Sequence, residues 1–124
     1  MNVFIAVINA FCLGKNAFQK LDKERVVVGG REKILILSIK EKKIIKEIER
    51  NFLVWTILVI EEKKIFICGG VSEDIAIFNS DNYEIINTII NAHNMNIRGI
   101  SLLNNGMIIS GSEDKTTKIW KLTI

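Results

Sequence analysis

Apolar and polar positions repeat one short pattern three times along the chain. Each copy has an apolar stretch that runs into a small residue and a glycine, then a polar turn, then a second apolar run. The glycines Gly29, Gly69 and Gly111 set a period of about 41 residues. Because the apolar stretches are short and rich in Ile and Val, the pattern predicts strands, and hence an all-β protein of three similar units.

Each unit contains four predicted short strands, named d, a, b and c in chain order. The units cover about residues 1–40, 41–80 and 81–124. Strand d is expected at 2–8, 43–48 and 84–90, strand a at 15–21, 54–60 and 97–103, strand b at 25–28, 65–68 and 107–110, and strand c at 34–39, 75–79 and 117–122. The b strands are apolar without alternation, so sheets stacked face to face should cover them on both sides.

One segment conflicts with this scheme. Residues 38–50 carry Ile44 and Ile48 four positions apart among many Lys and Glu residues, which is typical of a helix. The repeat makes 43–48 a strand, and we favour the repeat. Two joints agree with it, because Asn105-Gly106 indicates a hairpin and residues 79–82 (Asn-Ser-Asp-Asn) indicate a turn.

Composition narrows the classes of protein. The chain has 124 residues, of which 48% are hydrophobic and 25% charged, and it lacks proline. These values fit one small folded domain and exclude a disordered chain. The net charge of +3 comes from interspersed Lys and Glu, which favours a solvated surface over a nucleic-acid patch.

Membrane insertion and disulfide chemistry are not expected. Residues 52–60 are about half as long as a spanning helix. Residues 1–14 resemble a signal-peptide core, but they lack a basic start and fall inside the repeat. Cys12 and Cys68 have apolar neighbours, so we expect reduced core residues and an intracellular protein, cytoplasmic or nuclear.

The third unit carries the most specific motif. Residues 110–120, Ser-Gly-Ser-Glu-Asp-Lys-Thr-Thr-Lys-Ile-Trp, resemble the end of a WD40 repeat, and Ala92-His93 stands where that family usually has Gly-His. The period matches as well. The resemblance implies β-propeller blades, each a twisted four-stranded antiparallel sheet. It also implies a structural hydrogen-bonded network of His93, Ser110, Asp114 and Trp120.

The first two units depart from the family pattern. Phe11 replaces the His in the first unit, and Arg50-Asn51 stands near that place in the second. Phe78 replaces the Trp, although Asp74 matches Asp114. In the first unit Lys33 and Leu37 occupy the places of the Asp and the Trp. We therefore expect the full network only in the third unit, with packing holding the other two.

Three blades are too few for a closed propeller, which typically has four to eight. Three arrangements stay open: part of a larger propeller, which we favour, a pair of copies in a six-bladed ring, and a short open arc.

No catalytic, cofactor or metal site is indicated. His93 is the single histidine, and no Ser or Cys nucleophile stands in a recognisable motif with it. No second His or Cys lies at metal-ligand spacing. Gly29-Gly30 and Gly69-Gly70 do not lead into a helix with a Lys-Ser/Thr ending, so they indicate hairpin turns rather than phosphate loops.

The favoured function is therefore a protein-interaction module or scaffold, not an enzyme. The d–a loops (9–14, 49–53, 91–96) and b–c loops (30–33, 71–74, 112–116) should share one face. Exposed candidates for contact with protein or peptide partners are Arg31, Lys33, Glu73, Asn94, Asn96, Arg98 and Lys115. Trp55 is expected in the core, with partner contact as the alternative. A nucleic-acid-associated propeller is the second hypothesis, followed by a propeller enzyme or small-molecule binder.

Overall fold

A computed structural model of the chain describes residues 2–3, 7–8, 12, 14, 16–104 and 106–123. This part of the chain forms ten strands and one short 3₁₀ helix. They are β1 (Phe18–Lys20), β2 (Arg25–Gly29), β3 (Arg31–Ser38), β4 (Lys43–Ile60), η1 (Glu61–Lys63), β5 (Ile65–Gly70), β6 (Ile75–Asn79), β7 (Ile85–Ile89), β8 (Ile97–Leu102), β9 (Met107–Ser112) and β10 (Thr117–Lys121). The prediction of an all-β, antiparallel fold is confirmed.

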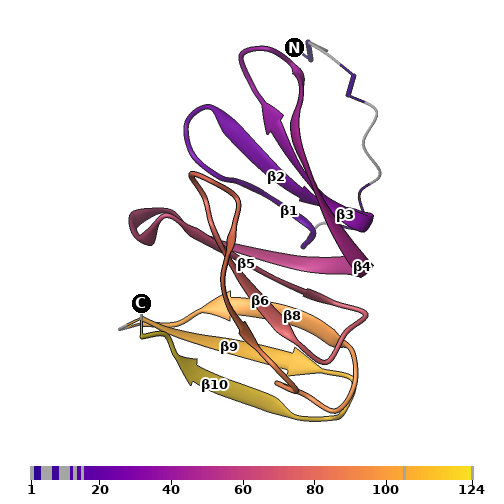
Figure 1. The fold of residues 1–124 in the computed structure, drawn as a ribbon, viewed down its shortest axis with the longest axis vertical. Helices are drawn as coiled ribbons and strands as arrows, with labels where there is room; N and C mark the ends of the chain where they lie inside the picture. The colour runs from indigo at the N-terminus through magenta and orange to yellow at the C-terminus, as the bar shows by residue number, and fades with distance from the viewer. Residues whose placement is uncertain are drawn as a thin grey trace.

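The strands form two hydrogen-bonded sheets. Strands β1 to β7 pair in chain order in one sheet, and β8, β9 and β10 form the other. The long strand β4 serves twice, since residues 43–49 pair with β3 and residues 54–60 pair with β5. We call β1–β3 with residues 43–50 the first blade, residues 54–60 with β5–β7 the second blade, and β8–β10 the third blade. Figure 1 shows the first and third blades at opposite ends of the molecule.

Segment 38–50 follows the repeat rather than its local helical pattern. Residues 43–49 lie in β4, where they form the edge partner of β3. The side chains of Ile44 and Ile48 are half-buried there, and the other side chains of residues 43–49, including Ile45, are exposed. Hydrogen bonding to β3 thus outweighs the local preference, as tertiary context commonly does.

Two details differ from the predicted strand layout. The strands expected at 43–48 and 54–60 are continuous in β4, and β7 pairs with β6 of the preceding unit, so the blades are displaced by one strand from the units. The third blade has three strands in the described residues instead of four. The strand at 2–8 and the Asn105-Gly106 turn rest on residues outside the described ones, and the division into units stays a prediction.

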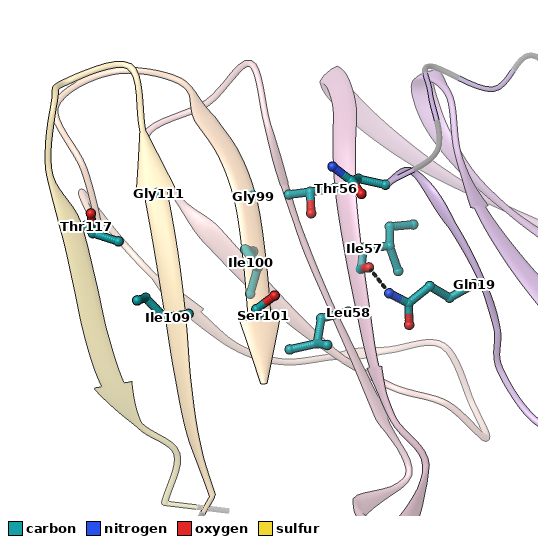
Figure 2. A pocket seen from close by; sticks show the side chains of 11 residues that line it. Gln19, Thr56, Ile57, Leu58, Gly99, Ile100, Ser101, Ile109, Gly111 and Thr117 are labelled. Carbon is teal, nitrogen blue, oxygen red and sulfur yellow. Dashed lines mark hydrogen bonds between the residues drawn. The ribbon is translucent and has the colours of Figure 1, made fainter. Parts of the chain in front are cut away.

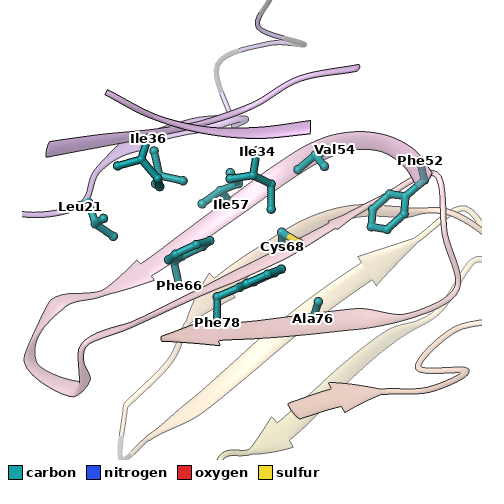
Figure 3. Close-up of a cluster of buried hydrophobic side chains, with 11 residues drawn as sticks. Leu21, Ile34, Ile36, Phe52, Val54, Ile57, Phe66, Cys68, Ala76 and Phe78 are labelled. Carbon is teal, nitrogen blue, oxygen red and sulfur yellow. The ribbon is translucent and has the colours of Figure 1, made fainter. Parts of the chain in front are cut away.

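Two apolar clusters hold the blades together. The first lies between the first and second blades and includes Leu21, Val27, Ile34, Ile36, Phe52, Val54, Ile57, Phe66, Cys68, Ala76 and Phe78 (Figure 3). Phe66 and Phe78 stack there with ring centroids 5.0 Å apart. The second cluster lies between the second and third blades, around Ile67, Ile77 and Ile97.

The second blade is therefore covered on both faces. Every residue of β5 is buried, as the unbroken apolar run predicted. In the third blade the residues of β9 alternate between buried and half-buried, because one face alone packs on a neighbour within the described structure.

Strand β1 is joined to the inner edge of β4 through a side chain. Gln19 Nε2 donates to the Ile57 carbonyl at 2.9 Å, and Val59 N–H donates to Gln19 Oε1 at 3.2 Å. The Ile57 N–H donates to the Asn16 carbonyl at 2.8 Å. These bonds satisfy backbone groups of β4 that its pairing with β5 leaves free.

Candidate functional site

The four side chains singled out in the third unit lie in one chain of hydrogen bonds. His93, in the loop before β8, is fully buried, and its Nε2 lies 2.8 Å from Ser110 Oγ. Its Nδ1 lies 3.0 Å from Asp114 Oδ2, and Trp120 Nε1 donates to Ser110 Oγ at 2.9 Å. The indole N–H of Trp120 can only donate, so Ser110 Oγ accepts from it. A neutral His93 with its proton on Nδ1 then satisfies every partner, because Ser110 is free to donate its own proton to Nε2.

Asp114 ties together two loops. Its carboxylate accepts from the backbone N–H groups of Asn94 at 3.0 Å and Thr116 at 2.8 Å, and from the Thr116 hydroxyl at 2.5 Å. The Thr116 hydroxyl, then the two backbone donors and His93, hold the pKa of this carboxyl well below its ordinary value. The sequence reading did not single out Thr116.

Ser110, His93 and Asp114 stand in the order of a nucleophile, a base and an orienting carboxylate. A nucleophile of that kind must reach a substrate. Ser110 is fully buried, and its oxygen already accepts from the indole of Trp120. The geometry therefore suits a structural tie between β9, β10 and the loop before β8.

Different residue types occupy the positions of the second blade that are equivalent to this network. Cys68 stands in the place of Ser110 and Phe78 in that of Trp120, and the Arg50 guanidinium carbon lies 5.4 Å from the Phe78 ring centroid. It also lies 4.9 Å from that of Phe52, a cation–π arrangement. Burial raises the pKa of the Cys68 thiol to about 12, despite the opposing effect of the Arg50 charge. Phe11, the counterpart in the first unit, lies outside the described residues.

Aromatic, charged and amide side chains that solvent can reach lie together where β4 meets β8. The Arg98 guanidinium carbon lies 4.3 Å from the centroid of the half-buried Trp55 ring. Glu113 Oε2 accepts from Arg98 Nε at 3.0 Å and Nη2 at 2.5 Å, and Glu113 Oε1 accepts from Asn96 Nδ2 at 3.0 Å. We call Trp55, Asn96, Arg98 and Glu113 the rim cluster.

The other predicted partner contacts divide into two groups. Glu73, Asn94 and Lys115 are exposed on loops that meet beside His93, where the His93 N–H donates to the Glu73 carbonyl at 3.2 Å. Arg31 and Lys33 lie in β3 of the first blade, where Lys33 Nζ forms an ion pair with Glu47 at 2.9 Å. The loop expected at 9–14 falls largely outside the described residues.

The sequence reading missed Glu113. It lies in the predicted loop 112–116, but nothing in the local sequence shows that its carboxylate faces Arg98. The relevant signal is positional. Arg98 is the second residue of one strand of a predicted hairpin, and Glu113 follows the other strand, so pairing of the two strands brings these residues close together.

Other site types find no support in the described part of the chain. No group of three His, Cys, Asp or Glu residues there fits a metal ion. No helix among the described residues has the length and apolarity needed to cross a membrane.

Comparison with known proteins identifies the fold. No family model matches the chain, and no curated protein matches it in sequence. A solved structure, the crystal structure of RRP9 WD40 repeats, is similar with a TM-score of 0.78 over 86% of this chain, at 16% identity. The chain spans 35% of that protein's length. The fold is therefore WD40-like, with antiparallel blades arranged as in part of a β-propeller.

Proposed function

We propose that this chain is a WD40-repeat region that acts as a protein-interaction module or scaffold and presents the rim cluster to a peptide segment of its partner. The observation that carries the proposal is the stacked Trp55–Arg98 pair held by Glu113. Trp and Arg dominate the binding energy of protein interfaces, especially when neighbouring groups fix their positions. The Arg98 side chain is 62% exposed, so a partner can reach it.

Structural stability alone does not account for the rim cluster. An exposed ion pair contributes about 0–1 kcal/mol, and an exposed cation–π contact contributes about 0.5–1 kcal/mol. An ordered aromatic and guanidinium pair at an exposed loop edge instead suits recognition, because little side-chain freedom is lost on binding.

The arrangement also favours protein over the alternative partners. Nucleic-acid binding needs an excess of cations along a surface, whereas Arg98 is neutralised by Glu113. An enzyme needs reactive groups that converge on an accessible point, whereas the buried His93 and Ser110 satisfy each other.

The test uses a phage-displayed library of random peptides, selected against the folded chain. Affinities of the selected peptides are then measured for the wild type, Trp55→Ala, Arg98→Ala and a control, Lys63→Ala. The control changes an exposed residue of η1, the short helix that follows β4. We expect about tenfold or greater weakening in the two rim variants, as for interface hot spots, and less than about twofold in the control. Melting temperatures verify that each variant is folded.

Two results would count against the proposal. One is a selection that enriches no peptide. The other is a set of peptides that bind all four proteins equally, because the binding surface would then lie elsewhere.

A further inference from the structure

The outer strands of the first and second blades have the same geometry. Within the described part of the chain, residues 43–49 pair with β3 alone and β7 pairs with β6 alone, so each strand leaves one edge open. The register of each strand is interrupted at the same place, beside Ile45 in the first blade and beside Ile86 in the second. Residues 44–49 therefore correspond one to one with residues 85–90. The cavity of about 360 Å³ in Figure 2 lies elsewhere, between the inner strands and the third blade.

The two open edges differ in charge. Residues 46, 47 and 49 are Lys, Glu and Glu, whereas the corresponding residues 87, 88 and 90 are Asn, Thr and Ile. Ile85 and Ile86 of β7 are 50% and 41% exposed, and Ile90, directly after this strand, is 71% exposed. Charged side chains on an edge strand prevent edge-to-edge pairing, so the first blade is protected against it and the second blade is not.

The backbone of β7 offers hydrogen-bonding groups at its open edge. The Asn79 N–H of β6 donates to the Glu84 carbonyl at 2.8 Å, so alternate residues of β6 from 79 to 75 face β7. Thr88 lies opposite residue 76, which faces β5, so the N–H and C=O of Thr88 point toward the open edge. There the Thr88 N–H donates to Asn87 Oδ1 at 2.9 Å. The Asn87 side chain thus takes the place that a neighbouring strand would fill.

We propose that β7 pairs along this edge with β7 of a second copy of the chain, in an antiparallel dimer with Asn87 opposite Asn87 of the second copy. In that register the Thr88 N–H donates to the Ile86 carbonyl of the other copy, as in an ordinary antiparallel ladder. The Asn87 side chain is released and meets its counterpart across the two-fold axis. The inference does not depend on the proposed function or on the rim cluster.

The sequence of β7 is complementary to itself about Asn87. Ile85 lies opposite Ile89 of the second copy, and Ile86 lies opposite Thr88. Each of these pairs joins two β-branched side chains, which stabilises an antiparallel pair, and no two like charges face each other. All the residues that pair in this register lie within β7.

Two other pairings fit less well. An axis at Thr88 would require Ile90, which lies in the turn after β7. The corresponding pairing of the first blade would place Lys46 opposite Lys46 of the second copy, and like charges directly opposite each other are destabilising. Self-pairing thus suits β7 and not the strand that corresponds to it.

Disulfide trapping tests the register. The background is Cys12→Ser, which removes the exposed thiol, while the buried Cys68 is kept. Opposite residues of a non-hydrogen-bonded antiparallel pair have Cα atoms about 4.5 Å apart, a distance that a disulfide can span. We expect Asn87→Cys to form linked dimers at least about tenfold faster than Lys46→Cys at the corresponding position, because pairing raises the effective thiol concentration. Thr88→Cys, which lies off the axis, should be as slow as Lys46→Cys.

Sedimentation velocity measures the association itself. The matched variants are Ile86→Lys and Ile45→Lys, which change corresponding side chains that are 41% and 40% exposed. The wild type and Ile45→Lys should form dimers as the concentration rises, whereas Ile86→Lys should stay monomeric because it places a charge in the paired edge. Melting temperatures verify that each variant is folded.

Three results overturn the proposal. The first is a wild-type chain that stays monomeric up to about 1 mM. The second is a dimer that persists in Ile86→Lys, because another surface would then join the copies. The third is a linkage rate for Asn87→Cys that is no higher than the rates for Lys46→Cys and Thr88→Cys.

Discussion

The second and third blades share a strand pattern but are stabilised in different ways. The second blade packs on both faces. Next to Gly69 it has Cys68, which packs in one cluster with Phe78, and the Arg50 guanidinium lies over the Phe78 ring. The third blade packs on one face, and there Ser110 bonds to His93 and Trp120. A sheet with two apolar faces tolerates loss of the polar network, whereas a sheet with one apolar face gains from directional bonds that fix its loops.

The largest expected difference lies in the equivalent isoleucines Ile77 and Ile119. Ile77→Ala should lower the free energy of unfolding by about 3 kcal/mol, because the side chain is 3% exposed and leaves a cavity. Ile119→Ala should change it by less than about 0.5 kcal/mol, as is usual for a surface substitution. Urea denaturation followed by Trp fluorescence measures both values. Equal losses would mean that something already covers the outer face of the third blade.

Substitutions at Gly69 and Gly111 should change the stability with the same contrast. Gly69→Ala should cost about 2 kcal/mol, because the added methyl group meets Ile97 in a packed interface. Gly111→Ala should be neutral or stabilise the protein by up to about 0.5 kcal/mol, since alanine restricts the unfolded chain. Thermal unfolding of the two variants provides the comparison. A destabilised Gly111→Ala would contradict the free space beside Gly111.

The polar network of the third blade should respond to loss of one hydroxyl group. Ser110→Ala leaves the buried His93 Nε2 and the Trp120 indole without their shared partner, and we expect a loss of about 1.5 kcal/mol. A double-mutant cycle with Trp120→Phe measures how much of this loss belongs to the Ser110–Trp120 pair. Cys68→Ala at the equivalent position serves as the control for truncation without hydrogen-bond loss. Strict additivity in the cycle would show that the indole bond contributes nothing.

The smallest effect is expected in the pH dependence of stability. The folded-state pKa of Asp114 lies below its ordinary value of 3.8, so the stabilisation is present above the unfolded-state value and is lost as pH falls toward the folded-state value. Asp114→Asn should therefore differ most from the wild type at neutral pH, and the gap in melting temperature should narrow below about pH 4. Arg25 also lowers the pKa of Asp22, but Asp22 is present in both proteins, so its effect on the difference in melting temperature cancels. A gap that stays constant down to about pH 2.5 would contradict the assignment.

Much of the fold and part of the site could be predicted because they depend on local patterns. Apolar runs and glycines recur with a fixed period, so strand positions such as β5 and β6 emerged without tertiary information. The residues around His93 were singled out because their types and spacing resemble one repeat motif, and the structure places them within hydrogen-bond distance.

The sequence by itself determined that this chain forms short antiparallel strands in a repeating order. The tertiary structure decided which faces are covered, that residues 43–60 form one strand, and that Arg98 lies between Trp55 and Glu113. The physical reason is the range of the interactions. Strand preference and turn chemistry act between near neighbours in the chain, whereas burial depends on how the blades pack. Ile77 and Ile119 occupy the same place in the repeat, and only packing makes one of them core and the other surface.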